Sequence, residues 1–245
     1  MSSVANVGYD FSLNGDPEVT VHAVGAEAEP VMVVDGVMRR PDVLVEYAAR
    51  EVSFQPAPAR ENFYPGLLGA IPLTYVSALV EALRPQLEEV FELGDAVPVR
   101  ASCNYSIVTC QPAQLEPAQR IPHVDTADPL QIAILHYLCD ERFDGTGFYR
   151  HRSTGFEGIT LERWAPYQAA LAADLERHPP EAAYIGGDTP LFERTARFDL
   201  RFDRVLVYRS RVLHSGQIDP AVGLSPDPRR GRLTGNIFLN YGRRA

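Results

Sequence analysis

The sequence predicts a mainly β protein with some α-helix, built as a β-sandwich or barrel. After residue 100, five short segments rich in β-branched and aromatic residues are separated by turns, which is typical of such folds. Before residue 100, apolar residues recur every three or four positions, as in amphipathic helices that pack on another layer. The length of 245 residues is ordinary for one sandwich or barrel, and 45% hydrophobic residues suffice for a sizeable core.

Residues 1–100 are expected to form an N-terminal support region that is mainly helical. Two short strands are expected near its start, in EVTVHAV (18–24) and PVMVVDG (30–36), because apolar residues there are dense and β-branched. The segment RENFYPGLLG (60–69) is expected to be a loop with a Pro-Gly turn.

Two helices are expected in this region. Residues 40–52 favour a helix because Pro41 suits a first helical position and apolar residues follow at helical spacing. Residues 72–93 favour a second helix, which Pro85 should break or kink because proline lacks a backbone N–H.

Residues 101–245 are expected to form the β core, and the whole chain, 1–245, is taken as one domain. A helix at 160–178 interrupts the strands within an inserted segment, 157–190, which is long enough to cover the mouth of a barrel. The basic stretch YRHRS (149–153) is expected to be a solvated turn, with binding of an anionic substrate group as the alternative. The strands are expected at ASCNYSIVTC (101–110), LQIAILHYLC (130–139), GFYRHR (147–152), RFDRVLVYRS (201–210) and LTGNIFLNY (233–241).

Charge and composition narrow the classes of partner. A net charge of -9 and a pI of about 5.2 disfavour nucleic acids and anionic membranes, since both need a basic face. The first residues, MSSVANVGYDFSLNGD, lack the basic and apolar stretches of a secretory signal peptide. Cys103, Cys110 and Cys139 are an odd number of cysteines in apolar context, which favours reduced, buried thiols. We therefore expect a cytoplasmic protein, and the sequence leaves its oligomeric state open.

The stretch RIPHVDTADPL (120–130) places His123 and Asp125 two positions apart. Two residues is the strand period, so in an extended segment both side chains leave the same face. That geometry suits a single iron ion with a further ligand from elsewhere in the chain. Taken alone, the pattern recurs by chance, and a solvated surface loop is the alternative.

His214 is the candidate third ligand. It follows a strongly apolar strand in RVLVYRSRVLHSGQ and precedes Ser and Gly, so we expect it at a strand start near the barrel mouth. Two histidines and one carboxylate make the facial triad that holds Fe(II) and leaves coordination positions open. Of the other histidines, two are expected on the surface, one in the core or at its rim and one in the basic turn: His22, His178, His136 and His151.

Arg232 and Thr234 lie two apart in GRLTGNIFLNY, and therefore on one strand face. An arginine fork with a hydroxyl beside it is what a buried carboxylate at a pocket floor requires. Asn236 and Phe238 continue that face and are expected to line the pocket.

The order of these segments resembles the Fe(II)/2-oxoglutarate-dependent oxygenase superfamily, and within it the prolyl-hydroxylase-like branch. HVDTADPLQIAILHYLCDERFDGTGFY is similar to that branch's HxD strand, its YL strand and its Gly-rich segment, with Asp144 where a first Gly is usual. RVLVYRSRVLHSG and GRLTGNIF are similar to its last two strands. The chain also resembles DUF6445, a bacterial group of this superfamily with a YPG segment and an ending like GRLTGNIF.

The resemblance implies a double-stranded β-helix, of the jelly-roll or cupin-like kind, with the N-terminal helices on its outer face. It implies that His123, Asp125 and His214 bind Fe(II). It further implies that Arg232 pairs with the far carboxylate of 2-oxoglutarate, with Thr234 beside it.

Two tyrosines enter through the same resemblance. Tyr137 matches a tyrosine that hydrogen-bonds the far carboxylate of 2-oxoglutarate in the prolyl-hydroxylase-like branch. A second tyrosine often precedes the HxD loop in that branch. Its place here falls near Gln111, so Tyr105 is the expected substitute.

The activity that the resemblance implies is that of a dioxygenase. Such an enzyme uses O₂ and 2-oxoglutarate, releases succinate and CO₂, and hydroxylates an unactivated C–H bond of a small molecule, an amino acid or a peptide side chain. Two alternatives stay open: a cupin-type metal enzyme without 2-oxoglutarate, and a non-catalytic β-helix binding module. Arg232 argues against the first, and the intact set of ligands argues against the second.

Overall fold

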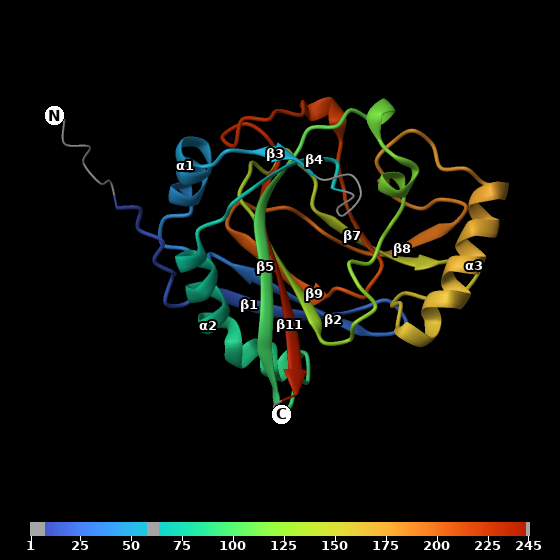
Figure 1. Ribbon diagram of the computed structural model, residues 1–245, viewed down its shortest axis with the longest axis horizontal. Coiled ribbons are helices and arrows are strands. Elements are labelled where there is room, and N and C mark those ends of the chain that lie inside the picture. The colour runs from blue at the N-terminus through green and yellow to red at the C-terminus, as the bar shows by residue number, and fades with distance from the viewer. Residues whose placement is uncertain (1–7, 58–63, 244–245) are drawn as a thin grey trace.

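The computed structural model describes residues 8–57 and 64–243, and it consists mainly of two antiparallel β-sheets (Figure 1). The sheets face each other where the ring of Phe148 lies 5.2 Å from that of Tyr208. The prediction of a mainly β protein with few helices is confirmed. The larger sheet has the spatial order β1 (Glu18–Val24), β2 (Glu29–Asp35), β9 (Arg204–Arg209), β6 (Gln131–Tyr137), β11 (Leu233–Arg243), β5 (Ala96–Val108), β4 (Gly66–Gly69) and β3 (Gln55–Pro56). The smaller sheet has the order β10 (His214–Gly216), β7 (Thr146–His151) and β8 (Phe192–Phe198).

The first hundred residues contribute more strand than expected. β1 to β4 all join the larger sheet, with β2 paired to β9 and β4 paired to β5. The expectation of a mainly helical region for 1–100 is therefore corrected, because pairing with strands from the second half stabilises short strands that are weak signals alone. Residues 60–63 of the expected loop lie outside the described residues, as do residues 1–7 of the N-terminal segment. Gly66–Gly69, the end of that expected loop, is a strand.

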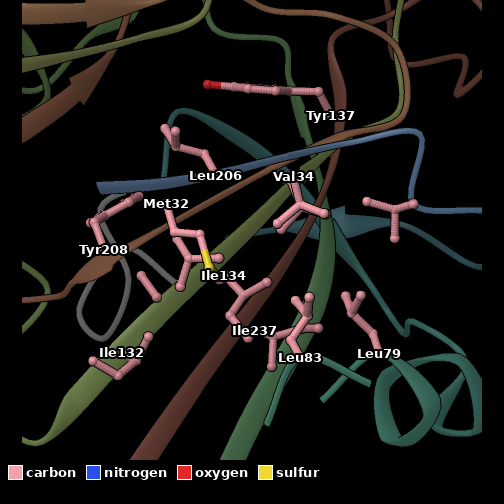
Figure 2. Close-up of a cluster of buried hydrophobic side chains, with 14 of the residues drawn as sticks. Met32, Val34, Leu79, Leu83, Ile132, Ile134, Tyr137, Leu206, Tyr208 and Ile237 are labelled. Atoms are coloured by element: carbon pink, nitrogen blue, oxygen red, sulfur yellow. The ribbon is translucent and has the colours of Figure 1, made fainter. Parts of the chain in front are cut away.

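Two helices cover the outer face of the larger sheet: α1 (Asp42–Glu51) and α2 (Leu73–Val90). Figure 2 shows Leu79 and Leu83 of α2 beside Ile237 of β11. Burying each of these side chains contributes about 1.5–3 kcal/mol relative to exposure. The predicted helices at 40–52 and 72–93 are confirmed. Of the expected break or kink at Pro85, the break is wrong, because α2 is a single helix whose buried leucines anchor it on both sides of that exposed proline.

The third helix, α3 (Leu161–Arg177), confirms the helix predicted at 160–178. It lies beside the smaller sheet, on the opposite side of the molecule from α1 and α2 (Figure 1). Tyr167 of α3 packs in a second core cluster with Tyr149 and Phe192. Thr160 caps the helix by accepting a hydrogen bond from the backbone N–H of Arg163. Short 3₁₀ turns occur at Pro112–Gln114, Pro117–Arg120 and Pro220–Val222.

The basic stretch 149–153 is not a solvated turn. β7 continues to His151, which is fully buried, with its ring 5.2 Å from that of Tyr167 and its Nε2 3.2 Å from a carboxylate oxygen of Asp174. The expectation failed because α3 covers this strand, and the local sequence does not show that contact.

The structure shows the burial of the three cysteines and the character of the helices. Cys139 is buried, but Cys103 and Cys110 are only half-buried; all three are free thiols. Within the described residues, no helix is long and apolar enough to cross a membrane.

Candidate metal centre

His123, Asp125 and His214 each present one ligand atom, and these atoms all lie within 4.8 Å of one another. Nε2 of His123 is 3.8 Å from Oδ1 of Asp125, and Nε2 of His214 is 3.9 Å from Oδ2. Both distances exceed a hydrogen bond. Two ligands that share one ion at about 2.1 Å each stand up to about 4.2 Å apart, so both of these histidine–aspartate distances fit a common metal ion.

The local backbone brings the three side chains together. His123 follows a 3₁₀ turn and Pro122, and it pairs with His214 as an isolated antiparallel bridge. The backbone N–H of Asp125 donates to the carbonyl of Ser210 at 2.9 Å. His214 opens β10, where it pairs with Phe148 of β7. The ligands thus stand on backbone that is itself hydrogen-bonded.

The protonation of His214 is fixed by its surroundings. Its Nδ1 lies 2.9 Å from the carbonyl oxygen of Val212, which can only accept, so Nδ1 carries the proton. Nε2 is therefore the free donor atom, and a partner of this kind orients metal-bound histidines generally. The ring of Tyr208 lies 4.7 Å from that of His214 and packs against it.

The pKa values of the cluster suit metal binding. Burial lowers the pKa of His214 to about 4. Although 54% of the His123 side chain is open to the cavity, the surrounding protein and the imidazole of His214 lower its pKa to about 4. Burial raises the pKa of Asp125 to about 6. At pH 7 both imidazoles are neutral and the carboxylate is ionised, which are the forms that ligate a metal.

The cluster lies in the wall of a cavity of about 700 Å³. Arg232 and Thr234 line the same cavity, and so do Asn236 and Phe238, as their place on the strand face predicted. The structure therefore brings the candidate ligands and the candidate carboxylate-binding residues into one space.

Arg232 is buried, with 4% of its surface exposed. Its Nε and Nη2 donate to the carbonyl of Asp144, both at 3.2 Å, and Nη2 also donates to that of Gly145 at 3.0 Å. No acidic side chain within residues 8–57 and 64–243 forms an ion pair with Arg232. Because a buried charge without an opposite charge is costly, an anion in the cavity would complete this site. The side chain of Asp144 takes no part in this contact, since it pairs with Arg197 at 2.8 Å while its carbonyl accepts from Arg232.

Two candidate residues stand beside the guanidinium. The hydroxyl of Thr234 lies 2.7 Å from that of Ser106 and donates to the amide oxygen of Asn236 at 3.3 Å. The ring centroid of Tyr137 is 5.8 Å from the Arg232 Cζ, and its hydroxyl lies 2.7 Å from that of Thr146. Burial raises the pKa of Tyr137 to about 12, so its phenol stays protonated and can donate a hydrogen bond.

The expectation for Tyr105 is corrected. Its hydroxyl donates to the carbonyl of Leu44 in α1 at 3.1 Å, on the outer face of the sheet. The register explains this, because its neighbour Ser106 pairs with Thr234, which lines the cavity, so Tyr105 must face the helices. Gln111 is exposed and lies outside the cavity lining.

Tyr64 is the residue that sequence reasoning missed. It lines the cavity, and burial raises its pKa to about 12, a shift that the charge of Arg232 and hydrogen bonds with Ser106 and Thr234 partly oppose. Those three influences place its phenol beside the candidate carboxylate site. The YPG segment that contains it was the available signal, but it was interpreted only as a turn.

Comparison with solved structures gives weak similarities. One is to the crystal structure of a novel N-substituted L-amino acid dioxygenase from Burkholderia ambifaria AMMD, with 13% identity over 88% of this chain and 82% of that one and a TM-score of 0.38. Another is to a novel N-substituted L-amino acid dioxygenase in complex with alpha-KG from the same organism, with 12% identity, the same coverage and a TM-score of 0.34. Likenesses this weak carry no argument about the function of this chain.

The family comparison is more extensive. No curated protein matches the chain. A family model described as "Family of unknown function (DUF6445)" matches residues 15–239. Since that match spans most of the sequence, the chain belongs to the DUF6445 family.

Proposed function

We propose that the protein is an Fe(II)- and 2-oxoglutarate-dependent dioxygenase of the prolyl-hydroxylase-like branch. It would hydroxylate an unactivated C–H bond of a small molecule, an amino acid or a peptide side chain and release succinate and CO₂. The two facing sheets would form the double-stranded β-helix of that superfamily, in one domain spanning 1–245. The observation that carries the proposal is that one cavity contains two histidines, a carboxylate and a buried arginine without an acidic partner in the described residues.

His123, Asp125 and His214 would hold the iron. Two neutral imidazoles and one carboxylate are the donor set of non-haem Fe(II) oxygenases, and they leave coordination positions open for other ligands. Bound Fe(II), with 2-oxoglutarate and O₂, supplies the oxidising power that protein side chains lack. The protein's part is to orient the ligands, which the Val212 carbonyl does for His214.

Arg232 would bind the far carboxylate of 2-oxoglutarate. The carbonyls of Asp144 and Gly145 hold one edge of its guanidinium, which leaves Nη1 for the co-substrate. Thr234 and Tyr64 line the cavity with hydroxyl groups that can donate to a carboxylate, while the ring of Tyr137 packs on the guanidinium with its hydroxyl beside that of Thr146. A cupin-type enzyme without 2-oxoglutarate would have no use for a buried guanidinium here.

Anaerobic titration tests the proposal. The purified protein should bind one Fe(II) per chain, and 2-oxoglutarate should then produce a weak visible absorption band that saturates at one equivalent. Iron binding without that band would favour the cupin-type alternative. Absence of iron binding would favour the non-catalytic binding module.

A further inference from the structure

The cavity is larger than the co-substrate requires. At about 700 Å³ it falls within the range of about 300–1,000 Å³ that holds drug-sized ligands. A short diacid beside the iron site fills only part of it. The rest has two walls of different chemistry, one from the larger sheet and one from α3.

The sheet wall is uncharged, with polar side chains of β5 and β11 standing among apolar ones such as Leu68, Leu135 and Phe238. Asn104 of β5 stands opposite Asn236 of β11 in the register, and Ser102 stands opposite Phe238. The amide nitrogen of Asn236 donates to Asn104 at 3.3 Å and to Ser106 at 2.7 Å. In the described part of the chain, nothing takes up the amide N–H groups of Asn104 or the hydroxyl of Ser102. These donors face the cavity and can bind carbonyl groups.

The helix wall is mainly aromatic and apolar, although Gln168 also belongs to it. Trp164, Tyr167 and Leu171 lie on one face of α3 by their spacing, and all three line the cavity. Trp164 keeps 40% of its surface exposed, which is unusual for the largest aromatic side chain. A flat or apolar group in the cavity would cover it.

Charge is confined to the iron site and Arg232. Among the described residues that line the cavity, the acidic, basic and histidine side chains are those of His123, Asp125, His214 and Arg232. The proposed function uses all four, for iron and for 2-oxoglutarate. A charged substrate group in the remaining space would find no opposite charge among residues 8–57 and 64–243, and burying it unpaired would be costly.

We propose that the substrate is uncharged where it enters the cavity, with amide-like groups toward Asn104 and an apolar or aromatic group toward Trp164. A free amino acid, which carries both an ammonium and a carboxylate, does not fit this description. The inference rests on the proposed function, because that function assigns Asp125 and Arg232 to other ligands.

Trp164 is the only tryptophan in the chain, so its emission reports occupancy of the cavity without requiring turnover. Three probes share the Leu-Leu core and differ at one terminus, where a charge replaces a neutral amide: N-acetyl-Leu-Leu amide is neutral, N-acetyl-Leu-Leu is anionic and Leu-Leu amide is cationic. In protein loaded anaerobically with Fe(II) and 2-oxoglutarate, the neutral probe should shift the emission and bind at least tenfold more tightly than either charged probe.

A matched pair of variants tests the sheet wall. Asn104→Leu should weaken binding of the neutral probe about tenfold, because a carbonyl of the probe loses its donor. Asn14→Leu removes a carboxamide from an exposed position outside the cavity lining, and should leave the affinity unchanged. Equal effects of the two substitutions would contradict a role for Asn104 in binding.

Failure of this inference can be told apart from failure of the proposed function. The Arg232→Gln variant, assayed without iron and 2-oxoglutarate, lacks the arginine cation of the cavity. In this variant the neutral probe should still bind more tightly than the anionic one. If the wild-type protein gave no visible iron–2-oxoglutarate band while the Arg232→Gln variant kept its preference for the neutral probe, the result would count against the proposed function alone. A charged probe that binds as tightly as the neutral one in the loaded protein, or no emission change with any probe, would overturn the inference.

Discussion

His123 and His214 exchange two backbone hydrogen bonds, each 2.9 Å long. Residues paired in this way in an antiparallel ladder project their side chains to the same face, and the two rings lie 4.5 Å apart. The two candidate ligands are therefore placed by strand register, which is more rigid than a loop.

Because the pairing of His123 with His214 brings the candidate ligands together, we expect Fe(II) binding to need each of them. His123→Ala, Asp125→Ala and His214→Ala should each weaken Fe(II) binding more than a hundredfold, since each removes one of three protein ligands. Equilibrium dialysis of Fe(II) under anaerobic conditions measures the affinity. His178→Ala, at an exposed position after α3, is the control and should bind normally. Unchanged affinity in His214→Ala would show that the third ligand is a different residue.

Arg232 should control the affinity for 2-oxoglutarate. Arg232→Ala removes a charge-assisted pair from a desolvated site, which costs roughly 2–5 kcal/mol, a thirtyfold to several-thousandfold loss. Iron binding should stay nearly intact. Arg232→Lys should restore only part of the loss, because lysine presents a point charge and no fork.

The control for this prediction is Arg229→Ala. Arg229 is exposed and pairs with Glu46 at 2.7 Å, so its removal should leave the 2-oxoglutarate titration unchanged. If Arg232→Ala kept the wild-type titration, the cupin-type alternative would be preferred.

Substitution of Tyr64 and substitution of Tyr105 should have different effects on the affinity for 2-oxoglutarate. Tyr64→Phe should weaken 2-oxoglutarate binding about tenfold or more, since a hydrogen bond to a charged group contributes about 1.5–3 kcal/mol. Tyr105→Phe should leave that affinity unchanged, because its hydroxyl bonds to Leu44 on the other face of the sheet. The visible band measured against 2-oxoglutarate concentration distinguishes them, and the reverse ranking would restore Tyr105 to the site.

A stability prediction concerns Asp35 of β2, which stands opposite Arg204 of β9 and bonds to it through both oxygens at 2.7 Å. The hydrogen bond from Arg204 lowers the pKa of Asp35 below its usual value near 3.8. The folded state therefore binds fewer protons than the unfolded state, so the stabilisation is complete above pH about 4 and is lost as the pH falls through the lowered pKa.

Urea unfolding at several pH values checks this. Asp35→Asn should lower the free energy of unfolding by about 1 kcal/mol at pH 7, and the difference from wild type should shrink as the pH falls below about 4. Asp95→Asn, at an exposed position, should show no such pH-dependent difference. A difference for Asp35→Asn that grew at low pH would contradict the assignment.

The sequence by itself determined the helices of the described residues, several of the strands and two of the three candidate metal ligands. Apolar periodicity located all three helices, because a helix that covers a sheet must repeat its apolar face every three or four residues. Alternation along Arg232, Thr234, Asn236 and Phe238 placed one wall of the cavity, since side chains two apart in a strand share a face. The spacing of His123 and Asp125 followed from the same rule.

Only the tertiary structure decided which distant segments meet. The pairing of His123 with His214 and the burial of His151 beneath α3 are contacts between segments far apart in the chain, and local patterns do not encode them. The same holds for the two tyrosines: the register with β11 turns Tyr105 outward, while the approach of β4 to β5 brings Tyr64 to the cavity. Strand faces follow from local alternation, but which face is inside depends on what packs against the sheet, and that is a property of the whole fold.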